Sequence, residues 1–153
     1  RRESAPVTAI YDSSSFDPSN SVGRLMTLVK TSLMEALDLE LAPLDITAAQ
    51  FVVLVKLAGG ETASPSALCR GAAYDPGAMT RMLDRLERKK LVRRLRSPDD
   101  RRKITIELTA EGRAVYPKLI HGAVRVLNRS LRGFSKAEVR QLEDFLQRML
   151  ANG

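Results

Sequence analysis

The strongest constraint in the sequence is a change in the spacing of apolar residues between Asp75 and Leu108. Asp75-Pro76 is a typical helix start, with an N-cap acceptor before a proline. The apolar face of the predicted helix recurs at i, i+3, i+4 and i+7: Met79, Met82, Leu83 and Leu86. Leu91–Leu95 and Ile104–Leu108 are predicted as short strands, joined by a turn at Ser97-Pro98-Asp99-Asp100. The stretch therefore predicts an amphipathic helix followed by a β-hairpin.

The excess positive charge of the chain lies in this same stretch. The chain has 25 Lys and Arg against 18 Asp and Glu, a net charge of +7. Residues 81–103 contain 11 basic and 4 acidic residues, a difference of +7, so the other 130 residues are neutral in sum. A positive field confined to one helix and one hairpin is typical of a surface that binds a polyanion. The alternative is a solvated basic face with ion pairs such as Asp84 with Arg88.

Length and composition predict an ordinary globular chain. With 153 residues, 44% of them hydrophobic and 28% charged, we expect one compact domain. The single cysteine excludes an intrachain disulfide, and no apolar run is long enough to span a bilayer, so we expect a cytoplasmic protein without a membrane segment. The sequence contains no glycine-rich phosphate loop, metal-ligand cluster or nucleophile motif, which argues against an enzyme, a metal and a cofactor.

The segments before the basic helix are predicted to be mainly helical. Residues 1–20 are polar and are expected to form an arm, part of which packs on the body or on a partner subunit; terminal disorder is the alternative. A long helix is predicted for Ser19–Leu41, and Thr47 with Gln50 starts the next one through a capping box. Ser64-Pro65 starts a short helix that continues through Arg70, and Gly71–Tyr74 is the predicted turn before the basic helix. Short helices in this order predict a helix-turn-helix.

Two further helices are predicted after the hairpin. Thr109 is the expected cap of a helix to about Leu131, in which Pro117 should cause a bend or a local break. Ser135 with Glu138 forms a capping box for a last helix to about Leu150. The first helix and these last two exceed what a small DNA-reading core needs, which favours a helical dimer interface built from both ends of the chain.

The hairpin carries the turn Ser97-Pro98-Asp99-Asp100-Arg101-Arg102, and its second strand ends in Leu108-Thr109-Ala110-Glu111-Gly112. These motifs resemble the wing signature of the MarR family of bacterial transcription regulators, an Asp-x-Arg followed by a strand that ends in Leu-Thr-x-x-Gly. Met79–Glu87 resembles its recognition helix, and the order of elements agrees over about Ser21 to Leu150. This chain departs from the family in having Gly77 and Ala78 where serine or threonine is frequent, and Lys90 where glycine is usual. Lys90 is therefore expected to need a strained backbone or a different cap.

The resemblance implies a mainly α fold with a small β-hairpin wing, a winged helix-turn-helix with N- and C-terminal dimerisation helices. We expect residues 1–20 to form the arm, residues 21–46 and 109–153 the dimerisation region, and residues 47–108 the DNA-binding region. The family's function implies a homodimeric repressor that binds a pseudo-palindromic operator in double-stranded DNA. It also implies release by a small aromatic or phenolic effector or by cysteine oxidation.

Several side chains are predicted to contact DNA. Arg81 and Arg85 are expected to reach guanine edges in the major groove, with phosphate contact as the alternative. Arg102 resembles the wing-tip arginine that enters a minor groove, and Asp100 would position it or tie down the wing. The whole predicted set is Ser64, Ser66, Ala78, Thr80, Arg81, Arg85, Arg96, Asp100, Arg101 and Arg102. Arg93, Arg94 and Lys103 are expected near phosphate, although strand alternation must turn some of these cations away.

Three residues have weaker assignments. Cys69 is either a small core residue or a redox switch, whose thiol Arg70 would activate if the site were exposed. Met26 and His121 are candidates for an effector pocket, with core packing and a helix-surface position as their alternatives. The rival function for the whole chain is an architectural protein that coats DNA without sequence preference and binds mainly through phosphate.

Overall fold

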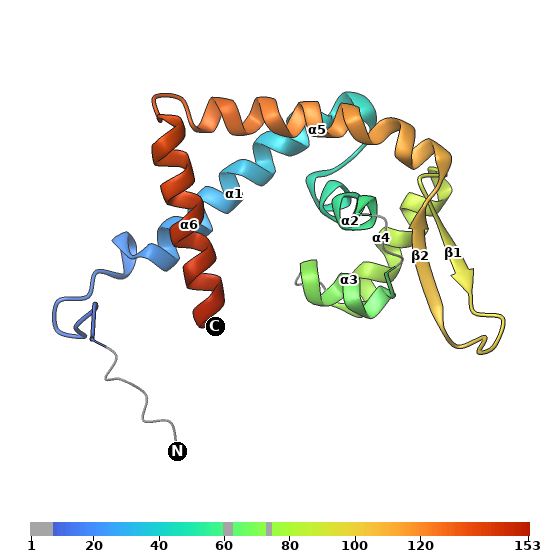
Figure 1. The fold of residues 1–153 in the computed structure, drawn as a ribbon, viewed down its shortest axis with the longest axis horizontal. Helices are drawn as coiled ribbons and strands as arrows, with labels where there is room; N and C mark the ends of the chain where they lie inside the picture. Colours follow the sequence, from blue (N-terminus) through green and yellow to red (C-terminus); the bar gives the residue numbers. More distant parts are fainter. Residues whose placement is uncertain (1–7, 60–62, 73–74) are drawn as a thin grey trace, which may run out of the picture. The chain divides into compact units, whose positions relative to one another are not determined.

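The computed structural model describes residues 8–59, 63–72 and 75–153. These residues belong to two compact units, Arg1–Ser32 and Leu33–Gly153, so each unit is described by itself. The elements, coloured along the chain in Figure 1, are η1 (Pro18–Asn20), α1 (Val22–Leu41), η2 (Ala42–Leu44), α2 (Ala48–Ala58), α3 (Pro65–Ala72), α4 (Pro76–Arg88), β1 (Val92–Arg96), β2 (Ile104–Leu108), α5 (Ala110–Ser130) and α6 (Lys136–Asn152). Helix α1 begins in the first unit and ends in the second.

In the first unit, the arm folds onto the start of its own helix. The Tyr11 ring meets the Phe16 ring edge to face, with 5.3 Å between centroids, and the Tyr11 hydroxyl accepts a hydrogen bond from the backbone N–H of Val22 at 3.0 Å. Residues 18–20 form the separate turn η1, capped by Asp17, so the long helix begins at Val22 and not at Ser19 as predicted. The predicted arm extends over residues 1–7, which lie outside the described residues.

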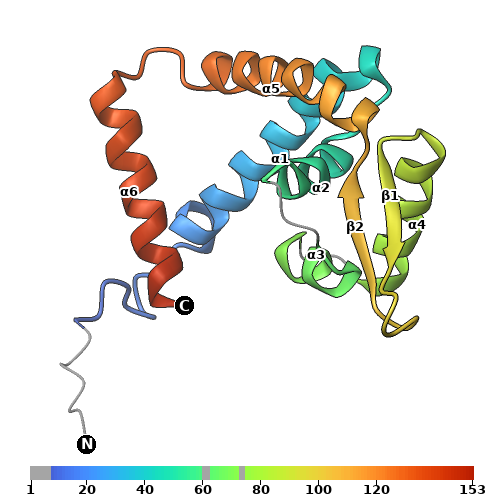
Figure 2. The same cartoon turned by 45° about the vertical axis from the view of Figure 1, so that its right-hand side comes forward.

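The second unit is built around the apolar stripe of α4. Met79, Leu83 and Leu86 are buried and Met82 is half-buried, which confirms the helical face predicted from their spacing. They pack in one core with side chains from α1, α2, α3, β2 and α5, for example Leu41, Leu54, Leu68, Ile106 and Leu119. Figure 2 shows α3, α4 and the hairpin gathered beside α2. Helix α2 buries Ala48, Val53, Leu54 and Leu57, while Ala49 and Val52 are only half-buried.

Capping places the starts of α2, α5 and α6 where the sequence predicts them. Thr47 and Ser135 form capping boxes with Gln50 and Glu138, and the Thr109 hydroxyl accepts from the backbone N–H of Gly112. Helix α5 continues through Pro117, so the predicted local break does not occur. Helix α3 includes Gly71 and Ala72, which the sequence assigned to a turn; the rest of that turn, residues 73–74, lies outside the described residues.

The hairpin is antiparallel, and its first strand, Val92–Arg96, begins and ends one residue later than predicted. Val92 pairs with Leu108 at its base and Arg96 with Ile104 toward its tip. Ala63 adds an isolated bridge to Ile106 through two backbone hydrogen bonds of 3.2 and 2.8 Å, which ties the segment before α3 to β2. Lys90, just before the hairpin, has φ +61°, the left-handed conformation that glycine would adopt more easily. The strained backbone expected at this position is confirmed.

Candidate nucleic-acid interface

Helix α4 presents a basic face opposite its buried stripe. Its start is set by Asp75, whose carboxylate accepts from the backbone N–H of Ala78 at 2.9 Å. Arg81, Arg85 and Arg88 are exposed at i, i+4 and i+7, so they share one side of the helix. Thr80 is also exposed, and its hydroxyl donates to the carbonyl of Pro76 at 2.9 Å. The geometry brings a cationic helix face to the surface with a hydroxyl near its N-terminal end.

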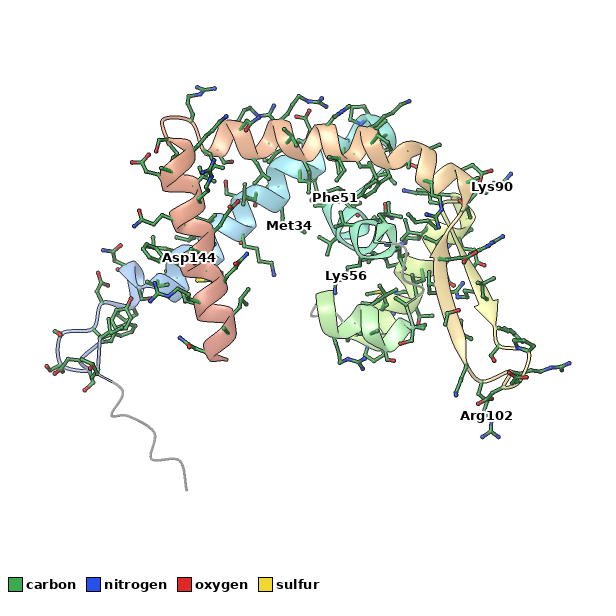
Figure 3. All side chains as sticks on the ribbon, viewed as in Figure 1. Met34, Phe51, Lys56, Lys90, Arg102 and Asp144 are labelled. Carbon is green, nitrogen blue, oxygen red and sulfur yellow. The ribbon has the colours of Figure 1, made fainter. Side chains whose placement is uncertain are left out.

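The wing tip is ordered by Asp100. Its carboxylate accepts from the backbone N–H of Arg102 at 3.0 Å, and its carbonyl accepts from the N–H of Lys103 at 2.9 Å. The turn is closed by the N–H of Ser97, which donates to the carbonyl of Lys103 at 3.0 Å. Asp100 therefore ties down the wing through the backbone. Arg101 and Arg102 are exposed there, and Figure 3 shows the Arg102 side chain pointing outward from the tip.

Some of the cationic side chains on the strands pair with carboxylates of the protein, and one has no such pair among the described residues and faces solvent. Arg93 pairs with Glu107 across the hairpin, and Arg94 pairs with Asp84 and Glu87 of α4. Burial disfavours the charged guanidinium, but the hydrogen bond to Asp84 and the charge of Glu87 outweigh it and raise the pKa of Arg94. Arg93 and Arg94 are thus both paired with carboxylates of the protein itself, although the Arg93 side chain stays exposed. Arg96 is exposed near the tip.

The proposed Asp84–Arg88 ion pair is replaced by a different contact. Arg88 Nε donates to the backbone carbonyl of Asp84 at 3.3 Å, while the Asp84 carboxylate binds Arg94. The pattern of alternating strand residues explains the division: Arg94 lies opposite Ile106, whose side chain is buried, and so faces the helix side of the hairpin. Sequence spacing showed that some strand cations must turn away but not which carboxylates would receive them.

A cavity of about 700 Å³ lies between the starts of α3 and α4 and the wing. Its wall includes Pro65, Cys69, Arg70, Thr80, Arg102 and Ile104. Ser64 and Ser66 also line it, with their hydroxyl oxygens 3.2 Å apart, and Ser64 caps α3 by accepting from the N–H of Ala67 at 3.1 Å. The cavity therefore brings together four of the predicted DNA-contacting residues, and it adds Arg70, which the sequence singled out only as a neighbour of Cys69.

The remaining candidates are dispersed. Ala78 is half-buried on α4. Cys69 is half-buried and packs against the core while also lining the cavity, so its position is compatible with both of its interpretations. Met26 is 40% exposed in the first unit, and His121 is exposed on α5 of the second. Neither contributes to the wall of this cavity, and their assignment to an effector pocket stays a prediction.

The described residues contain neither a metal-binding cluster nor a single membrane-spanning helix. No three His, Cys, Asp or Glu side chains among them are grouped so that they could hold a metal ion. Within the same residues, no single helix is long and apolar enough to cross a membrane; the bent pair of segments 22–44 and 48–58 passes that test by length and composition only.

Comparison with known proteins shows which family this chain resembles in sequence and fold. Residues 46–104 match the model of the MarR family. The chain is 37% identical over 130 residues to the multiple antibiotic resistance protein MarR of Escherichia coli, covering 84% of this chain and 90% of that protein. A cysteine-to-serine mutant of E. coli MarR complexed with operator DNA is 36% identical, with a TM-score of 0.75 over 88% of this chain and 99% of the other.

A second solved structure has the same fold. BpsR of Bordetella bronchiseptica, whose DNA binding is regulated by 6-hydroxynicotinic acid, is 27% identical to this chain. The match has a TM-score of 0.75 and covers 90% of this chain and 98% of that one. With its helix-turn-helix, β-hairpin wing and terminal helices, the chain belongs to the MarR family of DNA-binding transcription regulators and is not an enzyme.

Proposed function

We propose that the chain is a homodimeric repressor that binds a pseudo-palindromic operator. Helix α4 of each subunit enters the major groove with Thr80, Arg81 and Arg85, and Arg102 of the wing reaches the adjoining minor groove. The observation that carries this proposal is how the charge of residues 81–103 is arranged. Arg81, Arg85 and Arg88 are exposed on one face of α4, and Arg101 and Arg102 are exposed at the wing tip. Arg93 and Arg94, between them, are paired with carboxylates of the protein. The operator complex of the E. coli relative supports the same use of the fold.

Apolar surface at both ends of the chain supports the homodimer. In the first unit, Val22, Leu25, Met26 and Val29 of α1 are 40–58% exposed. In the second unit, Leu142, Phe145 and Met149 of α6 are 41–47% exposed. Such helical stripes are costly to leave in water, because each Å² of apolar surface contributes about 25 cal/mol when it is buried. Sedimentation at micromolar concentration should give a dimer, and a stable monomer would contradict this part of the proposal.

The proposed effector is a small aromatic or phenolic anion, bound in the cavity between α3, α4 and the wing. Apolar walls from Pro65, Pro76 and Ile104 suit an aromatic ring, and Arg70 and Lys103 suit its negative charge. The regulation of BpsR by 6-hydroxynicotinic acid supports this ligand class. Since Thr80 and Arg102 line the cavity and also belong to the proposed DNA surface, a bound ligand would favour the DNA-free state. Oxidation of Cys69 in the same cavity is the second proposed route to release.

The experiment is a DNA-binding titration across a salt series. The intergenic DNA beside the chain's own gene is compared with a random duplex of equal length. A repressor prefers the intergenic DNA by about 10³-fold or more at physiological salt. Equal binding that collapses with salt would instead establish the architectural function. The same assay, repeated with aromatic acids and with peroxide, separates the two routes of release; a Cys69→Ser variant should lose only the response to peroxide.

Arg102→Ala tests the wing. We expect it to weaken operator binding by about tenfold without a change in the circular dichroism spectrum, because each good groove contact contributes about 1–3 kcal/mol. The matched control is Arg132→Ala, which removes an exposed arginine from the turn after α5 and should bind DNA normally. Unchanged operator binding by Arg102→Ala at physiological salt would remove this residue from the interface.

A further inference from the structure

Arg94 joins the wing to the DNA-reading helix. It lies in the middle of β1, opposite Ile106, on the side of the hairpin that faces α4. Its guanidinium donates through Nη2 to the Asp84 carboxylate at 2.6 Å and through Nη1 to the Glu87 carboxylate. The Arg94 side chain is 26% exposed, so most of it lies between the helix and the hairpin. We call Arg94, Asp84 and Glu87 the Arg94 clamp.

The clamp depends on the shape of the guanidinium. Asp84 and Glu87 are three residues apart, so their carboxylates lie one above the other on the same side of α4. A planar fork with donors at fixed angles can bind two carboxylates at once, whereas an ammonium group is a single point charge on a flexible stem. The Arg94 clamp therefore restrains the direction of the hairpin relative to the helix axis, and charge alone would not.

This restraint matters because the two ends of the interface are on different elements. The exposed Arg81 and Arg85 are carried by α4, while Arg102 is carried by the tip of the hairpin. Two linked contacts strengthen one another only when the linker holds both in the geometry of the target. Binding to random DNA relies on phosphate charge and tolerates a loose wing, whereas a specific site needs both grooves to be engaged together.

We propose that Arg94 is a positioning residue for operator specificity: it sets the angle between the recognition helix and the wing and makes no contact with DNA. This inference rests on the proposed operator-binding function. Arg94 lies in the most cationic stretch of the chain. Its proposed role is to help distinguish the operator from random DNA, and this role does not depend on attraction between its charge and DNA phosphates.

The central test is Arg94→Lys, which keeps the charge and removes the fork. We expect the ratio of operator affinity to random-duplex affinity to fall by about tenfold, while the affinity for random DNA and its salt dependence stay as in the wild type. The matched control is Arg93→Lys. Arg93 neighbours Arg94 in the same strand but pairs with Glu107 within the hairpin, so this variant should keep the wild-type ratio.

Two carboxylate variants make the test independent of how well Arg94→Lys folds. Asp84→Asn and Glu87→Gln each remove one side of the clamp and one negative charge from the DNA-reading helix. If the clamp positions the wing, random-DNA affinity rises slightly and the operator ratio falls. If these groups act only through charge, affinity for both DNAs rises in parallel and the ratio stays constant, which would overturn the proposal.

The ratio of operator affinity to random-duplex affinity in the wild-type protein distinguishes failure of the proposed repressor function from failure of the Arg94 clamp. A wild-type ratio near one contradicts the proposed repressor function itself. A large wild-type ratio that Arg94→Lys and both carboxylate variants preserve contradicts only the clamp. A lowered ratio in Arg93→Lys as well would show that general loosening of the hairpin, and not this contact to α4, is responsible.

Discussion

Replacing Gly112 with alanine tests how the base of the wing is joined to α5. A Cβ atom at Gly112 would lie 2.2 Å from the carbonyl oxygen of Leu91 and 3.1 Å from its carbonyl carbon. That oxygen accepts from the N–H of Thr109 at 3.0 Å, and the N–H of Leu91 donates to Leu86 at 3.0 Å. Leu91 is therefore held through both its carbonyl and its N–H. The extra methyl group must displace this backbone and not the end of a flexible side chain.

The cost of Gly112→Ala follows from these contacts. Forcing a methyl group into a packed site costs about 1–3 kcal/mol, and loss of the Thr109–Leu91 hydrogen bond adds about 1 kcal/mol. The better helix propensity of alanine returns up to about 1 kcal/mol. We expect a net loss of about 2–3 kcal/mol. For a chain of this size, 1 kcal/mol corresponds to a change in Tm of about 2–4 °C, so Tm should fall by roughly 5–10 °C.

Thermal unfolding followed by circular dichroism measures this change. Protein concentrations must be equal, because association makes the apparent stability depend on concentration. The matched control is Gly59→Ala, where the only contact of the added Cβ with the described residues is the Lys56 carbonyl oxygen at 3.8 Å, an ordinary distance. If Gly112→Ala unfolded within about 2 °C of the wild type, the close approach of Gly112 to Leu91 would not limit stability, and the reasoning would be refuted.

Two further predictions concern stability. Lys90→Gly should stabilise the fold by up to about 1 kcal/mol in urea unfolding, because it relieves a left-handed backbone of φ +61°. DNA affinity should not change, since Lys90 and Arg102 lie at opposite ends of the hairpin (Figure 3); weaker binding would show that Lys90 reaches phosphate. For Glu40, hydrogen bonds from Arg129 and Arg125 lower its pKa below the ordinary value of 4.5. The unfolded chain therefore binds the proton more readily, and the stability from this contact is full above pH 4.5 and is lost as the pH falls through the lowered pKa. Glu40→Gln should remove this component from the acid limb of the unfolding free energy, and an unchanged acid limb would contradict it.

The candidate site was partly predictable because several of its determinants are local. Asp75, Thr109 and Ser135 cap helices through hydrogen bonds to residues only three positions away, so the caps follow from short motifs. The buried stripe of α4 follows from helical periodicity in the same way. The wing signature then placed Arg102 at an exposed turn. These features need no knowledge of the rest of the chain.

The sequence by itself thus determined the order of elements, the buried face of α4, the exposed basic stretch and the family. Only the tertiary structure decided which cations face solvent and which hold the protein together. Arg94 meets carboxylates 7 and 10 residues away, and Glu40 meets arginines 85 and 89 residues away. The Ala63–Ile106 bridge likewise joins distant segments. Hydrogen bonds of caps and turns are set by neighbours in the chain, whereas the partner of a long charged side chain is set by how separate elements pack.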